Sequence, residues 1–284
     1  MSIVVTGATG HLGRLVVEQL LEKVPAEEVT AVVRDEAKAA SFAARGVRIA
    51  VADYNTPESF DSLFAAGDKV LLISGNEFDK GRVQQHQVVI DAAKAAGVAL
   101  LAYTSAPGPL KAALADDHRG TEQALRASGV PYTLLRNGWY NENYTENLGP
   151  VLEHNAVVQA AGDGRVSSAA RADYAGAAVA VLTGEGHENA TYELGGDEAW
   201  GFAEFAAELS RQTGKEIVYN AVSVKDLTGI LAGAGIPGPV AAILAGVDAS
   251  IEKGELVVTS GDLSRLTGRP TTPLADSIAV ALKG

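Results

Sequence analysis

A glycine-rich turn near the N-terminus constrains the fold more than any other feature of this sequence. The turn directly follows a β-branched run, Ile3 to Thr6, and leads into a stretch of helical period. Its residues are Gly7, Ala8, Thr9, Gly10, His11, Leu12 and Gly13. In this setting Gly7 permits a tight turn, Gly10 lets the backbone approach a pyrophosphate, and Gly13 allows close helix packing. Because the unpaired N–H groups of a helix start also favour phosphate, the turn predicts a dinucleotide site. The alternative is a strand-to-helix turn without a ligand.

The next 130 residues repeat the strand–helix alternation that is typical of a parallel sheet covered by helices. Strands are expected at Ile3 to Thr6, Val29 to Val33, Val47 to Val51, Val70 to Ile73, Leu100 to Thr104 and Tyr132 to Leu135. Helices are expected at His11 to Lys23, Glu36 to Arg45, Pro57 to Ala65, Arg82 to Ala96 and Ala115 to Ser128. Thr56 before Pro57 predicts a helix cap, and Gly46, Gly97 and Gly129 predict left-handed helix ends. With right-handed crossovers, this order predicts an α/β, doubly wound Rossmann sheet.

After about Gly138 the alternation stops, and the sequence predicts a smaller mixed lobe. Helices are expected at Arg171 to Leu182, Phe202 to Thr213, Asp262 to Thr267 and Leu274 to Leu282, and strands at Thr191 to Leu194 and Ile217 to Asn220. Ser223 and Asp226 have the spacing of a capping box. We therefore expect a nucleotide-binding domain over residues 1–140, its sheet completed by later segments, and a substrate-binding lobe over residues 141–284.

One uncharged segment, Leu227 to Val247, is about long enough to span a membrane. Five glycines and two prolines interrupt it. Two short apolar helices meeting at Pro237-Gly238-Pro239 therefore fit this segment better than a membrane span.

Composition excludes several classes of function. The formal charge of −12 argues against nucleic-acid and acidic-membrane partners, which need clustered lysines and arginines. The absence of cysteine excludes disulfides, thiolate metal sites and a cysteine nucleophile, and no HExxH spacing suggests a metal. We expect a cytoplasmic protein with a small-molecule substrate, either a monomer or a homodimer.

The end of the second expected strand bears on the choice between NAD and NADP. Arg34 stands there, and with Lys38 one turn later it makes a plausible clamp for a 2′-phosphate, whereas Asp35 could accept from a ribose hydroxyl. The residues therefore favour NADPH and leave NADH open. Asp53, after the third strand, is a candidate to accept from the adenine amino group or is a plain turn acid.

Ser74, Gly75 and Asn76 end the fourth strand at the edge where open α/β sheets bind ligands, so cofactor contacts are expected there unless they form an ordinary turn.

The whole chain resembles the atypical short-chain dehydrogenases of the NmrA-like group. The motifs are TGATGHLG at Thr6 to Gly13, VPAEEVTAVVRD at Val24 to Asp35, AYTS at Ala102 to Ser105, PYTLLRNGWYNENY at Pro131 to Tyr144, AAGDGRV at Ala160 to Val166 and RADY at Arg171 to Tyr174. LRNGWY and AAGDG look most like the bacterial NAD(P)H:quinone oxidoreductase branch. DYNTPES, LTGEGHENATYEL and SIEKGE look closer to the triarylmethane reductases.

The resemblance implies NADPH contacts at Gly7 to Leu12, Arg34, Ser74 to Asn76 and a segment after the sixth strand. The residues of that segment are Arg136, Asn137, Gly138, Trp139, Tyr140 and Asn141. Trp139 and Tyr140 also offer flat apolar surface for a nicotinamide or a planar substrate, and Asn143, with Asn137 and Asn141, could orient it. The alternative is an aromatic cluster that joins the two lobes.

One departure from the wider family concerns catalysis. Most short-chain dehydrogenases protonate a carbonyl with a Tyr and a Lys four residues later, and no such pair follows Ser105 here. His118 and Glu122 have the same spacing. A histidine can deliver protons near neutral pH, but one on a helix beside Asp116 and Asp117 is typically a surface residue. The catalytic residue is therefore left unassigned.

The missing pair favours an acceptor that takes hydride without acid help. We expect an NADPH-dependent oxidoreductase of quinones or similar planar electrophiles, in which the protein positions the nicotinamide against the acceptor. A triarylmethane dye is the alternative substrate, and acidic residues such as Glu142 and Glu146 would suit its positive charge. A regulator that senses NADP(H) without turnover is the alternative from another class.

Overall fold

The computed structural model describes residues 2–75 and 81–283, which fall into two compact units. The first unit comprises Met1–Ala106, Asp117–Asn137 and Arg171–Tyr192, and the second comprises Pro107–Asp116, Gly138–Ala170 and Glu193–Gly284. The units do not follow the expected linear division at residue 140, because the chain crosses between them several times. The Arg171–Tyr192 segment returns to the first unit and contributes one helix and most of the last sheet strand.

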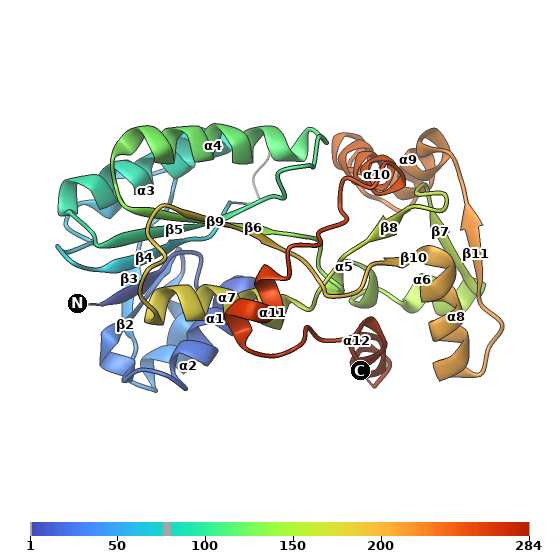
Figure 1. The fold of residues 1–284 in the computed structure, drawn as a ribbon, viewed down its shortest axis with the longest axis horizontal. Coiled ribbons are helices and arrows are strands. Elements are labelled where there is room, and N and C mark those ends of the chain that lie inside the picture. The colour runs from blue at the N-terminus through green and yellow to red at the C-terminus, as the bar shows by residue number, and fades with distance from the viewer. Residues whose placement is uncertain (1, 76–80, 284) are drawn as a thin grey trace. The chain divides into compact units, whose positions relative to one another are not determined.

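The first unit is built on a seven-stranded parallel sheet, which confirms the predicted α/β Rossmann class (Figure 1). The strand order is β3-β2-β1-β4-β5-β6-β9. The strands are β1 (Ile3–Val5), β2 (Val29–Val33), β3 (Arg48–Val51), β4 (Lys69–Leu72), β5 (Leu100–Ser105), β6 (Tyr132–Asn137) and β9 (Ala190–Leu194). The order reverses between β1 and β4, and in open α/β sheets ligands bind at the carboxyl ends of the strands at such a point.

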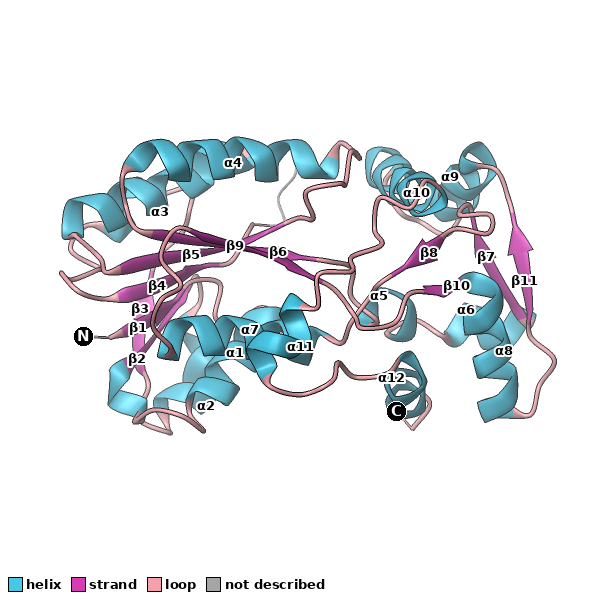
Figure 2. Ribbon diagram, viewed as in Figure 1, coloured by secondary structure: helices cyan, strands magenta, loops and turns pink. Residues whose placement is uncertain are grey.

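Helices cover both faces of this sheet (Figure 2). On one face lie α3 (Arg82–Ala96) and α4 (Leu114–Ser128), and on the other lie α1 (His11–Leu20), α2 (Ala40–Ala43) and α7 (Arg171–Thr183). Strands covered on both sides read as nearly continuous apolar runs, as in the fully buried β5. Val89 and Ile90 of α3 share one core cluster with Leu101 and Tyr103 of β5.

Two expected helices are wrong in length. In place of a helix over Glu36 to Arg45, a 3-10 turn, η2 (Glu36–Ala39), leads into the four-residue α2, which buries Phe42 completely. In place of a helix over Pro57 to Ala65 there is only η3 (Pro57–Phe60), because the chain turns at Ser62 with φ of 57°.

The expected cap at Thr56 is also wrong. Its side chain makes no cap hydrogen bond, and its carbonyl instead accepts from the Ser59 hydroxyl at 2.5 Å.

Other helix ends are as predicted. Gly46, Gly97 and Gly129 all have positive φ, at 89°, 70° and 79°. Ser223 caps α9 (Val224–Gly233) by accepting from the Asp226 N–H at 3.1 Å. Turn chemistry of this kind is local, so the sequence alone was enough to place it.

The second unit is a mixture of short strands and helices. β7 (Ala156–Gln159) pairs in parallel with β11 (Val218–Ala221), and β8 (Arg165–Val166) pairs antiparallel with β10 (Trp200–Gly201). The remaining helices are α5 (Glu142–Thr145), α6 (Gly149–His154), α8 (Phe202–Thr213), α9, α10 (Gly238–Glu252), α11 (Asp262–Thr267) and α12 (Leu274–Ala281), and a further 3-10 turn in the first unit is η1 (Ala26–Glu28). The uncharged segment therefore forms two helices, α9 and α10, as predicted. Over the described residues, no helix has the length and apolar character needed to cross a membrane.

Candidate active site

The glycine turn has the geometry that its sequence predicts. Gly7 has φ of 61°, and its carbonyl accepts from the Gly10 N–H at 3.0 Å. A Cβ on Gly13 would lie 2.2 Å from the Gly7 carbonyl oxygen and 2.8 Å from the Ala8 Cα, so only glycine fits there. The first turn of α1 thus rests directly on the backbone that ends β1, and the turn forms a cradle without side chains.

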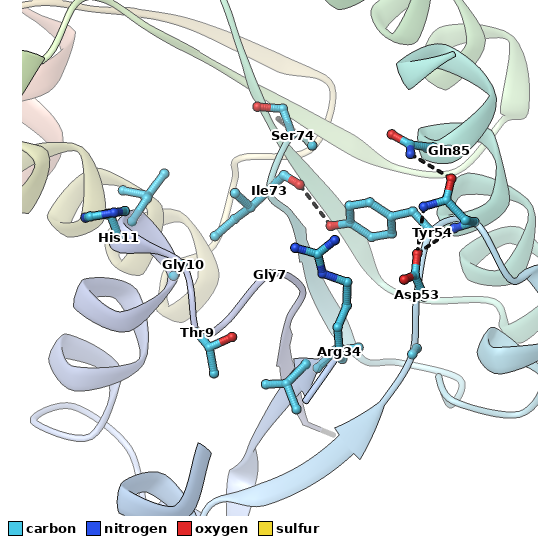
Figure 3. A pocket seen from close by; sticks show the side chains of 17 residues that line it. Gly7, Thr9, Gly10, His11, Arg34, Asp53, Tyr54, Ile73, Ser74 and Gln85 are labelled. Atoms are coloured by element: carbon cyan, nitrogen blue, oxygen red, sulfur yellow. Dashed lines mark hydrogen bonds between the residues drawn. The ribbon is translucent and has the colours of Figure 1, made fainter. Parts of the chain in front are cut away.

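A cavity of about 270 Å³ opens beside this turn, at the carboxyl ends of β1 to β4 (Figure 3). Ten residues predicted for the cofactor line it: Gly7, Thr9, Gly10, His11, Leu12, Gly13, Arg34, Asp53, Ser74 and Gly75. Ala8 is buried beneath the turn, where its N–H donates to the Val32 carbonyl at 3.2 Å. Asn76 lies outside the described residues.

Arg34 and Asp35 were the two candidates to contact the adenosine ribose or its 2′-phosphate, and they have different surroundings. Arg34 lines the cavity and its side chain extends into it (Figure 3). Asp35 is the cap of η2, and its Oδ1 accepts from the Ala37 N–H at 3.0 Å. Lys38 lies in η2 and is not among the described residues that line the cavity. The arrangement presents a guanidinium, not a carboxylate, to a ligand at the end of β2.

Sequence reasoning missed Arg14, whose side chain is fixed beside the cavity. Its Nε donates to the Thr9 carbonyl at 3.2 Å and its Nη2 donates to the Lys38 carbonyl at 3.0 Å. The guanidinium also lies 5.8 Å from the centre of the Phe42 ring. Its position directly after Gly13 was the available signal.

The sequence also missed three polar side chains of the cavity wall, Tyr54, Asn55 and Gln85. Asp53 Oδ1 accepts from the Asn55 N–H at 2.8 Å, and Gln85 Nε2 donates to Asn55 Oδ1 at 2.9 Å. The Tyr54 hydroxyl donates to the Ile73 carbonyl at 2.9 Å and lies 2.5 Å from Thr6 Oγ1. Adjacency to Asp53 pointed to Tyr54 and Asn55, but only tertiary contact brings in Gln85.

The end of β4, the strand next to β1, forms a further wall of the cavity. Ile73 donates its N–H to Thr6 Oγ1 at 3.2 Å, and Ser74 donates its N–H to Thr104 Oγ1 at 2.9 Å. Gly75 donates its N–H to His86 Nε2 at 3.0 Å. The side chains of Thr6, Thr104 and His86 therefore accept from the successive amides of this wall.

His118 is buried, with 8% of its surface exposed, so the expectation of a surface residue is wrong. Its Nδ1 lies 2.8 Å from the Tyr103 hydroxyl and its Nε2 lies 3.2 Å from Arg82 Nη2. Burial, with nearby Arg82, lowers the pKa of His118 to about 3. A proton-donor role for His118 stays a prediction, and these surroundings oppose it because the imidazole is neutral near pH 7.

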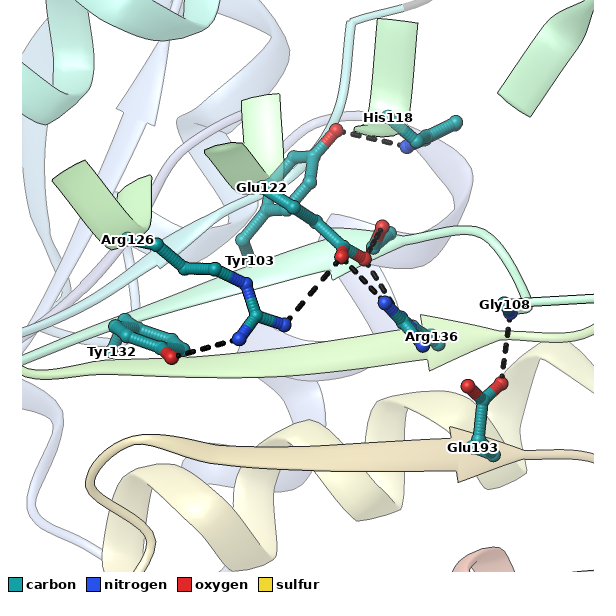
Figure 4. Close-up of polar contacts among 9 residues, drawn as sticks. Tyr103, Gly108, His118, Glu122, Arg126, Tyr132, Arg136 and Glu193 are labelled. Atoms are coloured by element: carbon teal, nitrogen blue, oxygen red, sulfur yellow. Dashed lines mark hydrogen bonds and ion pairs between the residues drawn. The ribbon is translucent and has the colours of Figure 1, made fainter. Parts of the chain in front are cut away.

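Glu122, which shares the four-residue spacing with His118, is paired with Arg136 (Figure 4). Arg136 Nε donates to Glu122 Oε1 at 2.8 Å and its Nη2 donates to Oε2 at 2.6 Å. Ser105 donates its hydroxyl proton to Glu122 Oε1 at 2.6 Å. Burial raises the pKa of Glu122, but the hydrogen bonds from Arg136 and Ser105 outweigh it, so the pKa falls below its usual value. The proton of the Ser105 hydroxyl is therefore already donated to an ionised carboxylate.

The segment predicted after β6 divides between the units. Arg136 and Asn137 end β6 in the first unit, whereas Gly138, Trp139, Tyr140, Asn141 and Asn143 belong to the second. Asn141 is fully buried there, where its Nδ2 donates to Ser277 Oγ at 2.9 Å and its Oδ1 accepts from Ser168 Oγ at 2.5 Å. Trp139 and Tyr140 are half-buried and Asn143 is exposed. Roles for this segment in cofactor or substrate binding stay predictions.

Comparison with known proteins gives concordant matches along the chain. A family model described as NAD(P)H-binding matches residues 7–185. Quinone oxidoreductase 2 of Escherichia coli (strain K12) is 47% identical over 281 residues, which cover 98% of this chain and 97% of that protein.

Two solved structures are also similar over nearly their full length. An NADPH-dependent quinone oxidoreductase from Escherichia coli, complexed with NADPH, matches with a TM-score of 0.95 and 46% identity over 99% of both chains. The Citrobacter sp. triphenylmethane reductase complexed with NADP(H) matches with a TM-score of 0.94 and 43% identity, covering 99% of this chain and 100% of its own.

Proposed function

Because the chain belongs to the NAD(P)H-binding family, we propose that it is an NADPH-dependent oxidoreductase that transfers hydride to a quinone or a similar planar electrophile. Family membership confirms the class of ligand that the glycine turn predicts. Arg34 supports the choice of NADPH, since it lines the cavity while the Asp35 carboxylate caps η2. The glycine turn supports a pyrophosphate site, because Gly10 lines the cavity at the start of α1, where the unpaired N–H groups of a helix favour phosphate.

The observation that supports this class of acceptor is the hydrogen bond from the Ser105 hydroxyl to Glu122. Its hydroxyl is bonded to Glu122, and Arg136 holds that carboxylate in its ionised form. Of the groups near the ends of β5 and β6, neither Ser105 nor Glu122 is therefore disposed to protonate a carbonyl oxygen. An electrophile that needs no acid help suits such a site better than a simple ketone.

When bound, the nicotinamide supplies a hydride, and with one further proton from solvent a quinone becomes a quinol. The residues of this chain would bind and orient the dinucleotide. The glycine turn would hold the pyrophosphate, Arg34 the 2′-phosphate, and the Ser74–Gly75 wall would fix the inner end of the cavity. A cytoplasmic location, with a monomer or homodimer acting on a small planar substrate, completes the proposal.

A triarylmethane dye is the second candidate acceptor. It is supported by the 43% identity to a triphenylmethane reductase, and the chain's charge of −12 would favour a cationic dye over an anionic one. Quinones lead because the match to a quinone oxidoreductase is the stronger in identity.

The test is NADPH oxidation by the purified chain with a panel of quinones and with malachite green and crystal violet. We expect turnover with quinones, followed as loss of the reduced nicotinamide absorbance. Turnover with the dyes alone would shift the assignment to a dye reductase. NADPH binding without oxidation by either panel would contradict an enzyme and favour a regulator that senses the cofactor.

A further inference from the structure

One buried histidine, His86, accepts a hydrogen bond from the cavity wall at the end of β4, which is called the inner wall below. Gly75 lines the cavity at the end of β4, and its N–H donates to His86 Nε2 at 3.0 Å. His86 lies in the first turns of α3 and has no exposed surface. The preceding residue of α3, Gln85, donates to a side chain of the cavity wall, Asn55 Oδ1, at 2.9 Å. The imidazole of His86 attaches the helix to the backbone of the wall.

The hydrogen bonds around His86 define one tautomer. Because Nε2 accepts from Gly75, the single proton of a neutral ring lies on Nδ1. Nδ1 is 2.8 Å from Thr121 Oγ1, and the Thr121 hydroxyl donates in turn to the Asp117 carbonyl at 2.9 Å. Each group in this chain donates once in the same direction, from Gly75 through His86 and Thr121 to the backbone of α4.

The surroundings keep the ring neutral. Burial, together with the nearby positive charge of Arg82, lowers the pKa of His86 to about 3. A protonated ring would place a second N–H against the Gly75 N–H, where an acceptor is needed. The imidazole therefore remains an acceptor for Gly75 throughout the physiological range of pH.

We propose that His86 is a positioning residue for the dinucleotide, which fixes the Gly75 amide and so keeps the inner wall of the cavity formed before the cofactor binds. Thr6, Tyr54 and Thr104 hold the neighbouring polar groups of the same wall. A wall ordered in advance costs no conformational entropy on binding, so its order contributes to affinity. The inference rests on the proposed function only in taking NADPH as the ligand of the cavity.

The experiment measures NADPH affinity by titration calorimetry on the full chain and three variants. His86→Leu removes the acceptor with little change in volume, and His86→Gln places an amide oxygen at similar reach. Val89→Ala is the matched control, since Val89 lies on the same face of α3 and is fully buried without a polar contact. We expect His86→Leu to weaken NADPH binding by about tenfold or more and His86→Gln to restore most of it, because a buried N–H without an acceptor is costly.

Equal affinities for His86→Leu and Val89→Ala would overturn the proposal, since both would then report general packing. Nitrogen NMR of the wild-type ring gives a readout that requires no variant to fold. We expect an unprotonated Nε2 and a protonated Nδ1 from pH 8 down to about pH 5, as a lowered pKa requires. The opposite tautomer, or titration near the ordinary histidine value, would also overturn it. Failure of the proposed function is separate, because it appears as NADPH binding without turnover.

Discussion

At the scale of single residues, the proposed preference for NADPH over NADH rests on Arg34. Its guanidinium is exposed and extends into the cavity from the end of β2, whereas the neighbouring carboxylate of Asp35 is bonded to its own helix (Figure 3). Arginine matches phosphate through two parallel N–H donors, which a ribose hydroxyl cannot use equally. We therefore expect a cation at this place to favour NADPH over NADH.

We expect Arg34→Ala to weaken NADPH binding by roughly tenfold to a hundredfold, the loss of about one to two charge-assisted hydrogen bonds. NADH binding should change little, because NADH has no 2′-phosphate. Titration of both cofactors checks this, with Lys38→Ala as the control cation outside the cavity lining. Similar losses for the two cofactors would show that Arg34 does not read the phosphate.

The sequence predicted those site residues whose roles are local. The glycines of the turn act through their own backbone, and Arg34 and Asp53 stand one and two residues beyond a recognisable strand. Gln85 and His86 could not be found in this way, because their partners Asn55 and Gly75 are set by the packing of α3. His118 was expected at the surface beside two acids, but adjacent residues on a helix point in different directions.

At the scale of elements, the start of α1 depends on a contact that only glycine allows. A Cβ on Gly13 would lie within 3 Å of three backbone atoms of Gly7 and Ala8. Neither of those residues can move freely, because the Ala8 N–H is bonded to β2 and Gly7 already adopts a positive φ. Relief of the clash would have to displace α1 from the sheet.

We expect Gly13→Ala to lower the free energy of unfolding by about 2 kcal/mol or more, as overpacking does, and to weaken NADPH binding because the cradle widens. Gly229→Ala is the matched control, since Gly229 lies inside α9 with nothing within 4 Å of a Cβ. That change should stabilise the chain by about 0.5–1 kcal/mol through helix propensity alone. Urea titration with both variants is the measurement, and a neutral Gly13→Ala would contradict close packing at the turn.

Long, periodic elements were predicted better than short ones. The ranges expected for α3 and α8 agree with the structure at both ends, because segments of fifteen and twelve residues without glycine or proline are long enough to be recognised as helices. The strands β8 and β10 have two residues each, too few to show alternation, and were not predicted. η3 was predicted too long because nothing local marks Ser62 as a left-handed residue.

At the scale of the whole molecule, each unit contains buried groups whose pKa is shifted by burial. The pKa of two histidines is lowered in the first unit, and the pKa of an aspartate is raised in the second. In the first unit burial lowers the pKa of His86 and of His118 to about 3. In the second unit burial raises the pKa of Asp248, in α10, to about 6, although the Ala160 N–H donates to its Oδ2 at 2.6 Å. Tyr144 and Tyr219 are titratable neighbours of Asp248.

The two shifts act on stability in opposite directions as the pH falls. The histidines are neutral in the folded chain and gain protons only on unfolding below their unfolded pKa of 6.5, so their contribution is full above pH 6.5 and is lost toward pH 3. Asp248 takes up its proton in the folded chain near pH 6, but near 3.8 when unfolded. Its burial therefore destabilises the folded chain above pH 6, and that penalty is relieved as the pH falls toward 3.8.

We expect acidification from pH 7.5 to pH 5 to lower hydrogen-exchange protection around α3 and to raise it around α10, after correction for intrinsic exchange rates. One unit of pKa corresponds to about 1.4 kcal/mol. Between pH 7.5 and pH 5, each histidine should therefore lower the free energy of local unfolding by about 2 kcal/mol, and Asp248 should raise it by about 1 kcal/mol.

The control variant is Asp248→Asn, which keeps an acceptor for the Ala160 N–H and removes the charge. In that variant α10 should be better protected at pH 7.5 and insensitive to the change, whereas α3 should respond as in the wild type. If α10 instead lost protection at pH 5 in parallel with α3, the raised pKa of Asp248 would be wrong and a single cooperative response would govern both units.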